Sequence, residues 1–204
     1  MPIFFQHQIN ETTRLGIWKI EETEEFFLSN VPLQKEVTHP HKRLQHLAGR
    51  FLLQFLFPGF PYELIKIADT RKPYLPGEQY HFSISHCGDY AAAIVSSNQR
   101  VGIDIEIPSG KAGRIMEKFL TKKEQGIFNS KSFHDLRLTT LLWCCKESVY
   151  KWYGDGGVDF RRHIQLEGQN EGSETISCLF LKNNQPLLIH YSYFEHLVLA
   201  WVIS

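Results

Sequence analysis

Residues 101–107 constrain the fold more than any other stretch of this sequence because apolar and polar positions alternate strictly along them. The apolar positions are Val101, Ile103, Ile105 and Ile107, and those between them are Gly102, Asp104 and Glu106. A period of two residues is typical of a β-strand with one buried face. We therefore predict a half-buried strand whose other face presents two carboxylates.

Asp104 and Glu106 lie on the same face of this predicted strand. Two residues of strand advance the chain by roughly 6.5–7 Å, so both carboxylates can reach one small ligand. Two neighbouring carboxylates repel each other, and a hard divalent cation such as Mg²⁺ is the usual reason for both to stay ionised. A solvated acidic face is the alternative interpretation of the same pattern.

The composition is that of an ordinary globular protein. The chain has 204 residues, 43% of them hydrophobic and 22% charged, and its net charge is zero. Neutrality argues against a general nucleic-acid-binding protein, which usually carries a basic excess. The N-terminal residues lack signal-peptide features, and no apolar run approaches membrane-spanning length. Four cysteines, two of them adjacent, suit neither a disulfide framework nor a zinc site, so we expect reduced thiols and a cytoplasmic protein.

The first half of the chain contains one strongly amphipathic helix. Short strands are expected at residues 3–9 and 15–20, followed by an acidic helical segment over 21–28. The strong helix begins near Pro40, and its apolar stripe is made of Leu44, Leu47, Ala48, Phe51, Leu52, Phe55 and Leu56. Arg43, His46 and Arg50 line up along one flank of that stripe. This flank is either a solvated basic edge or a surface that faces phosphate groups.

A loop and a short meander of strands follow the helix. Prolines and a glycine predict a loop over residues 69–77, in which Pro73 biases Lys72 towards an extended conformation that could grip an anion. Residues 81–86 alternate as a strand, and residues 90–95 form a buried strand after a turn. Ser85 and His86 then lie close to that turn.

The second half contains a long helix with polar residues on one face. A capping box over Thr121–Glu124 begins a helix after a short helix over 114–120. The long helix runs from about residue 133 to Tyr153, with Gly154 as its stop. Glu147 and Lys151 point away from its apolar face. An exposed ion pair between them is the simplest interpretation, but Trp143 one turn earlier on the same face suggests a cleft or a partner.

Three strands are expected to finish the chain, near residues 175–182, 187–194 and 197–203, after a polar loop over 166–174. The order of strand, helices and strands in this half repeats that of the first half. We therefore predict an α+β protein of two similar α/β lobes, the N-terminal lobe over residues 1–98 and the C-terminal lobe over 99–204.

Four short motifs in this order resemble one enzyme family. They are Arg71–Pro73, Phe82–His86, Val101–Glu106 and Trp143–Lys151. Together they resemble the 4′-phosphopantetheinyl transferases of the two-lobed, surfactin-synthetase-activating type. The resemblance implies the fold of that family, in which two lobes form an intramolecular pseudodimer.

The resemblance also implies a reaction. In this family coenzyme A donates its 4′-phosphopantetheine to a serine of an apo carrier protein, which releases adenosine 3′,5′-bisphosphate and requires Mg²⁺. By resemblance, Asp104, Glu106 and Glu147 are the metal ligands and Lys151 lies near the transferring phosphate. Glu147 and Lys151 are then the expected catalytic residues, with Glu147 a candidate to take the serine proton and Lys151 to stabilise the departing bisphosphate.

The same resemblance assigns the binding of coenzyme A. Lys72, Ser85 and His86 match contacts to its phosphates, and Arg43 and Arg50 lie on a helix edge similar to the region that holds the nucleotide. The expected partner is an apo acyl or peptidyl carrier protein, with no nucleic acid or membrane involved and a monomer as the expected state.

Two positions depart from the family's pattern. Arg71 stands where the family often has Gly before the lysine-proline pair, and Cys87 replaces a serine that often follows the histidine. Arg allows fewer backbone conformations than Gly, so the loop at residue 71 is expected to differ or to add a phosphate contact.

Two other functions remain open at this point. The chain could be a module that binds coenzyme A or a carrier protein without catalysis, although the carboxylates and Lys151 are all present. It could also be a different Mg²⁺-dependent phosphate enzyme, but it lacks the glycine-rich phosphate-binding loops of the common nucleotide-binding folds.

Overall fold

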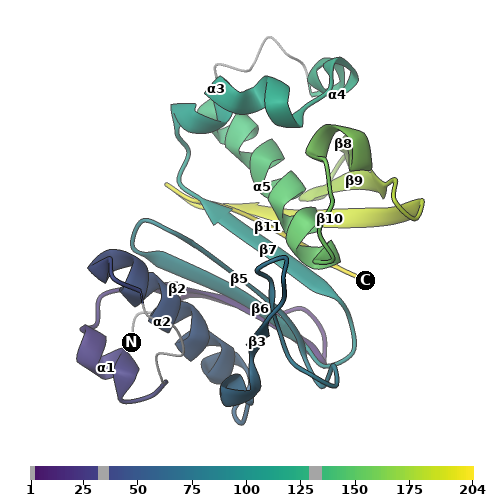
Figure 1. Ribbon diagram of the computed structural model, residues 1–204. Helices are drawn as coiled ribbons and strands as arrows, with labels where there is room; N and C mark the ends of the chain where they lie inside the picture. The colour runs from purple at the N-terminus through teal and green to yellow at the C-terminus, as the bar shows by residue number, and fades with distance from the viewer. Residues whose placement is uncertain (1–2, 32–36, 129–134) are drawn as a thin grey trace. The chain divides into compact units, whose positions relative to one another are not determined.

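A computed structural model describes residues 3–31, 37–128 and 135–204 of the chain. Helices and sheets are both prominent (Figure 1), which confirms the predicted α+β class. The chain divides into two compact units, Met1–Val101 and Gly102–Ser204. The boundary expected from the sequence, between residues 98 and 99, lies three residues earlier.

The first unit is built on a four-stranded sheet. Its strands are β1 (Ile3–Gln8), β2 (Thr13–Lys19), β5 (His81–Cys87) and β6 (Tyr90–Ser96), in the order β1-β2-β6-β5. All neighbouring strands are antiparallel. The predicted loop over 69–77 is wrong in part, because Pro73–Tyr74 forms a short strand, β4, paired with β3 (Lys66–Ile67).

Helix α2 (Pro40–Leu56) packs on this sheet and buries the predicted apolar stripe. His39 is the N-cap of this helix, because its ring accepts a hydrogen bond from the backbone N–H of Lys42. The helix therefore begins at Pro40, as the sequence predicted. Helix α1 (Glu24–Leu28) starts three residues later than the acidic segment suggested, because Thr23 is extended and forms its N-cap. A short 3₁₀ helix, η1 (Tyr62–Leu64), follows α2.

The second unit is built on a five-stranded sheet in the order β7-β11-β10-β9-β8. The strands are β7 (Val101–Glu106), β8 (Ile164–Gln169), β9 (Thr175–Phe180), β10 (Gln185–Tyr193) and β11 (Val198–Ile203). The expectation of a loop from residue 166 missed β8. Ile164 and Leu166 fill the core from this strand, but a bulge between Leu166 and Gly168 interrupts the alternation that would have identified it.

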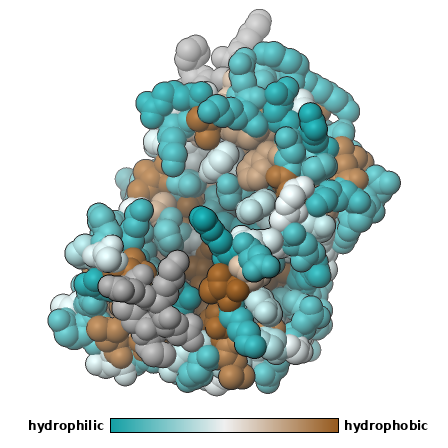
Figure 2. All heavy atoms as spheres, in the orientation of Figure 1, coloured by the Kyte–Doolittle hydropathy of each residue, from teal (hydrophilic) through white to brown (hydrophobic). Residues whose placement is uncertain are grey.

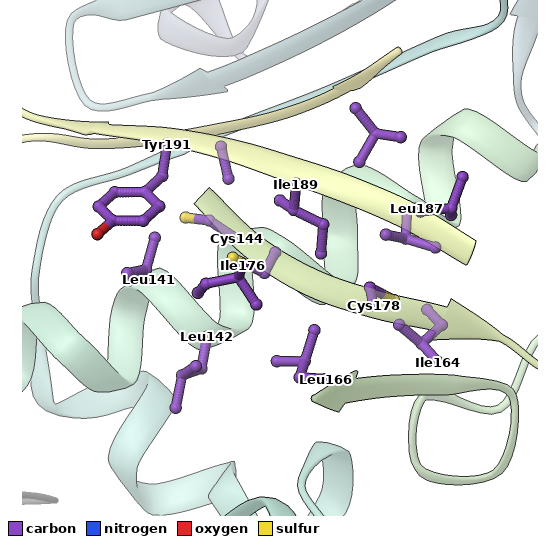
Figure 3. Close-up of a cluster of buried hydrophobic side chains, with 14 of the residues drawn as sticks. Leu141, Leu142, Cys144, Ile164, Leu166, Ile176, Cys178, Leu187, Ile189 and Tyr191 are labelled. Carbon is purple, nitrogen blue, oxygen red and sulfur yellow. The ribbon is translucent and has the colours of Figure 1, made fainter. Parts of the chain in front are cut away.

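Helix α5 (Leu136–Tyr153) covers this sheet, packing most extensively on β11 and to a smaller extent on β10. Asp135 caps the N-terminus of this helix, so the helix begins at Leu136. The predicted start near residue 133 lies outside the described residues. Gly154 ends it in the left-handed conformation, as predicted. Figure 3 shows side chains of α5 and of strands β8, β9 and β10 meeting in the core.

Three short helices complete the second unit. Helix α3 (Gly110–Phe119) begins four residues before the predicted Arg114, α4 (Lys122–Ile127) carries the predicted capping box, and α6 (Phe160–His163) precedes β8. No helix in the described part of the chain is long and apolar enough to cross a membrane. On the face shown in Figure 2, hydrophilic residues predominate and apolar ones form small separate groups.

All four cysteines of the chain lie in its described part, are buried and form no disulfide. Cys87 lies in the first unit, and Cys144, Cys145 and Cys178 lie in the core of the second. Burial raises the pKa of each of the three thiols in the second unit, because the charged thiolate would be desolvated there. These thiols are therefore protonated and serve as packing groups.

Candidate active site

Strand β7 is more deeply buried than its alternating sequence predicted. Residues 101–105 are all buried, and Asp104 on the supposedly solvated face is only 3% exposed. Glu106 at the end of the strand is half-buried. The interpretation of this face as a solvated acidic surface is therefore wrong for Asp104, whose carboxylate lies inside the protein.

Gly102 explains how α5 comes so close to this strand. A Cβ atom at residue 102 would lie 2.0 Å from the carbonyl oxygen of Ser148 and 2.6 Å from the backbone nitrogen of Trp152. Only glycine leaves room for the helix backbone at this distance. The close approach brings one turn of α5 alongside β7, two residues before Asp104.

Lys151 and Asp104 form an ion pair between the helix and the strand. The ammonium Nζ of Lys151 donates to Oδ1 of Asp104 at 2.7 Å. Burial on its own lowers the pKa of Lys151, but its contact with Asp104 and the nearby charge of Glu147 outweigh this and raise the pKa above its usual value. Lys151 is therefore fully charged at neutral pH.

Glu147 joins the same electrostatic cluster from one turn earlier on α5. Burial, followed by repulsion from Asp104, raises the pKa of Glu147 to about 7. Burial and Asp104 also raise the pKa of Glu106, and the charges of Lys111 and Lys151, followed by a hydrogen bond from the Trp143 side chain, partly oppose this. The structure thus brings Asp104, Glu106, Glu147 and Lys151 together; we call these four residues the carboxylate cluster.

The donor set of the carboxylate cluster fits a hard divalent cation. Its three carboxylates supply the oxygen ligands that Mg²⁺ prefers, and burial, followed by repulsion from Asp104, raises the pKa values of Glu106 and Glu147. Within the described residues, no three His, Cys, Asp or Glu side chains are already arranged as a metal site. The expectation that all three carboxylates share one ion stays a prediction.

A pocket open to solvent adjoins the carboxylate cluster. It holds about 270 Å³ of space, including its open mouth, and Glu106 and Lys111 contribute the charged groups of its lining. The apolar lining comes from Ile107, Ala112, Ile115 and Trp143. The side chain of Thr140 also lines the pocket, is 2% exposed, and has a hydroxyl without a hydrogen-bond partner among the described residues. Most of this space belongs to the open mouth, so the pocket is a shallow depression with a mixed apolar and charged lining.

The two arginines proposed for the nucleotide lie on α2 in different surroundings. Arg43 donates to both carboxylate oxygens of Glu24, at 2.7 and 2.8 Å, and to the carbonyl of Val37 at 3.0 Å. Arg50 is 6% exposed, and its Nη1 contacts the Nδ1 of His46 at 3.0 Å. Its buried Nε has no hydrogen-bond partner within the described residues, and burial lowers its pKa to about 10. Arg50 therefore has more capacity left for an anion than Arg43.

The other three residues assigned to coenzyme A are also in the first unit. Ser85 is buried in β5 and His86 beside it is exposed, while Lys72 is half-buried next to β4. Arg71 has a φ of 68°, so it adopts the left-handed conformation that glycine would take more easily. The loop therefore keeps a glycine-like backbone despite the departure from the family pattern. The contacts of Lys72, Ser85 and His86 with coenzyme A stay predictions.

Sequence reasoning missed one polar feature of the second unit. The side chain of Lys146, next to Glu147, is completely buried and bonded to Glu124 of α4. A signal for it was present, because Lys146 is four residues after Leu142 and three before Val149, both of which belong to the apolar face of α5. Lys111 and Trp143, which act on Glu106, were likewise not assigned to the site.

Comparison with known proteins places this site in a family. The family model described as the 4′-phosphopantetheinyl transferase superfamily matches residues 100–202, half of the chain, and this span includes the whole carboxylate cluster. Among curated proteins, enterobactin synthase component D of Salmonella austin is 34% identical over 115 residues, which are 56% of this chain and 49% of that protein. The protein of the same name from Escherichia coli strain K12 is 34% identical over 113 residues, 54% of each chain.

A putative 4′-phosphopantetheinyl transferase of Haemophilus influenzae is 31% identical over 125 residues, which are 59% of this chain and 53% of that protein. The chain therefore spans about half the length of the curated relatives it matches. The family match covers the strand that carries Asp104 and Glu106 and the helix that carries Glu147 and Lys151. This chain belongs to the 4′-phosphopantetheinyl transferase superfamily.

Proposed function

We propose that this protein transfers 4′-phosphopantetheine from coenzyme A to a serine of an apo carrier protein, with Mg²⁺ as cofactor and adenosine 3′,5′-bisphosphate as the second product. The carboxylate cluster carries this proposal, because it unites three acids and a lysine inside the span that matches the family model. The order of the four sequence motifs supports the two-lobed, surfactin-synthetase-activating type, with the two units as a pseudodimer.

The chemistry of the cluster suits transfer of a phosphoryl group. Asp104, Glu106 and Glu147 would hold Mg²⁺, which when bound supplies positive charge to the pyrophosphate of coenzyme A. The serine hydroxyl oxygen attacks the β-phosphorus, and the bond from that phosphorus to the oxygen of the departing bisphosphate breaks.

Glu147 and Lys151 have complementary roles in this reaction. A carboxylate oxygen of Glu147 accepts the proton of the serine hydroxyl. Without a bound cation, burial raises the pKa of Glu147 to about 7. Lys151 is charged at neutral pH and stabilises the negative charge that develops on the departing bisphosphate. Its ion pair with Asp104 holds the ammonium beside the reacting groups.

The anionic end of coenzyme A requires cations, which the first unit offers. Lys72, Ser85 and His86 are the proposed phosphate contacts, and Arg50 is a stronger candidate for the nucleotide than Arg43, whose guanidinium is already bound by Glu24. Pantetheine is an aliphatic chain with amide groups, and we propose that it lies against the mixed lining of the shallow pocket beside Glu106.

The proposed partner is an apo acyl or peptidyl carrier protein, and relatives named enterobactin synthase component D are compatible with a role beside a synthase. We propose that the protein acts in the cytoplasm as a monomer, without nucleic acid or membrane partners. Buried, reduced cysteines support this location.

Mass spectrometry tests the function directly. The protein is incubated with coenzyme A, Mg²⁺ and each of a panel of apo carrier proteins, and a carrier that gains the mass of one phosphopantetheine supports the proposal. Glu147→Gln should lower kcat by about 100-fold or more with the fold intact, because it removes the proposed base and one metal ligand.

Glu117→Gln is the matched control, since Glu117 is an exposed carboxylate on α3. Full activity in Glu147→Gln would refute the role of Glu147. Tight binding of coenzyme A by a folded protein that modifies no carrier in the panel would instead indicate a binding module.

A further inference from the structure

Lys146 of α5 lies at the centre of a closed polar network. Its side chain has no exposed surface, and that of Glu124, its ionic partner on α4, is 1% exposed. The ammonium Nζ donates to Oε1 of Glu124 at 2.5 Å, to the carbonyl of Phe160 at 2.9 Å and to that of Ile164 at 2.5 Å. Three N–H donors thus meet three acceptors, which is all that an ammonium group can offer.

The carboxylate of Glu124 is equally well occupied. Its Oε1 also accepts a hydrogen bond from the backbone nitrogen of Leu166 at 3.0 Å, and its Oε2 accepts from the backbone nitrogen and hydroxyl of Thr121 at 2.7 and 2.8 Å. The network therefore ties α5 to α4, to α6 and to β8. We call the side chains and backbone groups bonded to Lys146 and Glu124 the buried lysine network.

Such a network is not needed to hold the core together. Replacing a buried ion pair by apolar groups of similar size is often neutral or stabilising, because the pair loses its hydration on folding. What hydrogen bonds add is direction, since each requires a defined angle and distance. Three such bonds on one ammonium fix the direction in which residue 146 leaves the helix.

That direction decides where the neighbouring residue points. Successive side chains on a helix are separated by about 100° around its axis. The apolar face of α5 restrains its rotation through packing, and the bonds of Lys146 add a directional restraint that Glu147 and Lys151 share as part of the same helix. Gly102 sets how closely α5 approaches β7, but a smooth glycine surface does not by itself prevent rotation.

We propose that Lys146 is a positioning residue: its bonds to Glu124 and to the carbonyls of Phe160 and Ile164 set the rotation of α5 that places Glu147 and Lys151 beside Asp104. The geometric claim stands on the network alone. Its consequence for catalysis rests on the proposed function.

A double-mutant cycle on folding measures the geometric claim without any activity assay. Asp104→Asn, Lys151→Met and the double variant are made in the wild-type protein and in Glu124→Gln/Lys146→Met, where the buried pair is replaced by neutral groups of similar size. Chemical unfolding gives the coupling between Asp104 and Lys151 in each background. We expect about a tenfold coupling in the folding equilibrium constant in the wild-type background and less than twofold in the neutral-pair background.

Loss of general stability alone would not give this result. A merely structural network would shift all four variants of the cycle equally and leave the coupling unchanged, and that outcome overturns the proposal. If the neutral pair does not fold, Glu124→Gln alone serves as the second background, because Lys146 keeps its two carbonyl acceptors there. A coupling that is unchanged in Glu124→Gln overturns the proposal as well.

Kinetics with coenzyme A and an apo carrier then test the catalytic consequence. The folded neutral-pair variant should lose at least tenfold in kcat with KM for coenzyme A changed less than threefold. The control is Glu117→Gln/Lys122→Met, which removes an exposed pair on the neighbouring helices and should change neither value. If the wild-type protein transfers nothing, the proposed function fails while the folding cycle still decides the role of Lys146.

Discussion

Helix α5 carries two lysines five residues apart whose surroundings are opposite. Lys146 is enclosed and bonded to three acceptors, and burial lowers its pKa although Glu124 opposes this. Lys151 is partly exposed, and its acidic neighbours raise its pKa. One side of the helix thus has its charges saturated by protein groups, while the other gathers an excess of carboxylates.

The contrast indicates that one side of α5 has a structural role and the other side a functional role. Saturated groups gain nothing from a ligand, whereas the excess negative charge of the carboxylate cluster would be relieved by a cation. A helix whose closed side is rigidly bonded can present reactive groups on its open side with little reorganisation. The variants below test this contrast, from the largest expected effect to the smallest.

Replacing Lys146 or Lys151 by Met should give the largest difference in stability between the two sides of α5. Lys146→Met should lower the free energy of unfolding by about 3–5 kcal/mol, because it leaves the Glu124 carboxylate buried without its cation. Lys151→Met should lower it by only about 1 kcal/mol, since repulsion among the remaining acids can be relieved by protonation of Glu147. Urea unfolding of both variants measures this, and equal losses would contradict the contrast.

Alanine at residue 102 should disturb both sides of α5, because it pushes the whole helix away from β7. The added methyl group would meet the backbone of Ser148 and Trp152, which cannot move away as a side chain can. We expect Gly102→Ala to lower the free energy of unfolding by about 3 kcal/mol. Gly113→Ala on α3 is the control, because open space surrounds that position. A wild-type melting temperature in Gly102→Ala would show that the close approach is not required.

The side of α5 that carries Glu147 should make the stability of the protein depend on pH. Glu147 has a pKa of about 7 when folded and of 4.5 as an ordinary glutamate, so between these values the folded protein holds a proton that the unfolded chain releases. Stability must therefore fall as pH rises from about 4.5 to 7, by about 2 kcal/mol when no divalent cation is present. Unfolding at several pH values checks this. Glu147→Gln should flatten the slope, and a slope of opposite sign would contradict the assigned pKa.

Two adjacent threonines of α5 provide the finest comparison. Thr139 donates its hydroxyl to the carbonyl of Asp135 at 2.9 Å, whereas the buried Thr140 hydroxyl has no partner within the described residues. Thr140→Val should raise the free energy of unfolding by about 1 kcal/mol and Thr139→Val should lower it by a similar amount. Thermal unfolding of the two isosteric variants measures both changes in stability. Changes of the same sign would contradict the assignment of one bonded and one unbonded hydroxyl.

Local patterns allowed much of the fold to be predicted from the sequence. Alternation located β7, the spacing of apolar residues located α2 and α5, and the capping residues fixed the start of α4 and the end of α5. The bulge in β8 broke the period that identifies a strand, so that strand was missed. Periodicity fails where the backbone itself departs from regular geometry.

The candidate site was harder to predict because burial and pairing depend on distant parts of the chain. Glu147 and Lys151 could be placed on one face of a helix, but only tertiary contacts showed Asp104 buried against Lys151. Lys146 was overlooked because a lysine is seldom fully buried unless it is paired. Its partner, Glu124, was known only as the last member of a capping box.

The four buried cysteines can report local unfolding of the protein through their reactivity towards alkylating reagents. Alkylating reagents need an accessible thiolate, so none of these cysteines should react while its unit is closed. Cys87 would report the opening of the first unit, and Cys144, Cys145 and Cys178 that of the second. Counting the labels on each peptide over time would show whether the two units open independently or as one, without the introduction of any probe.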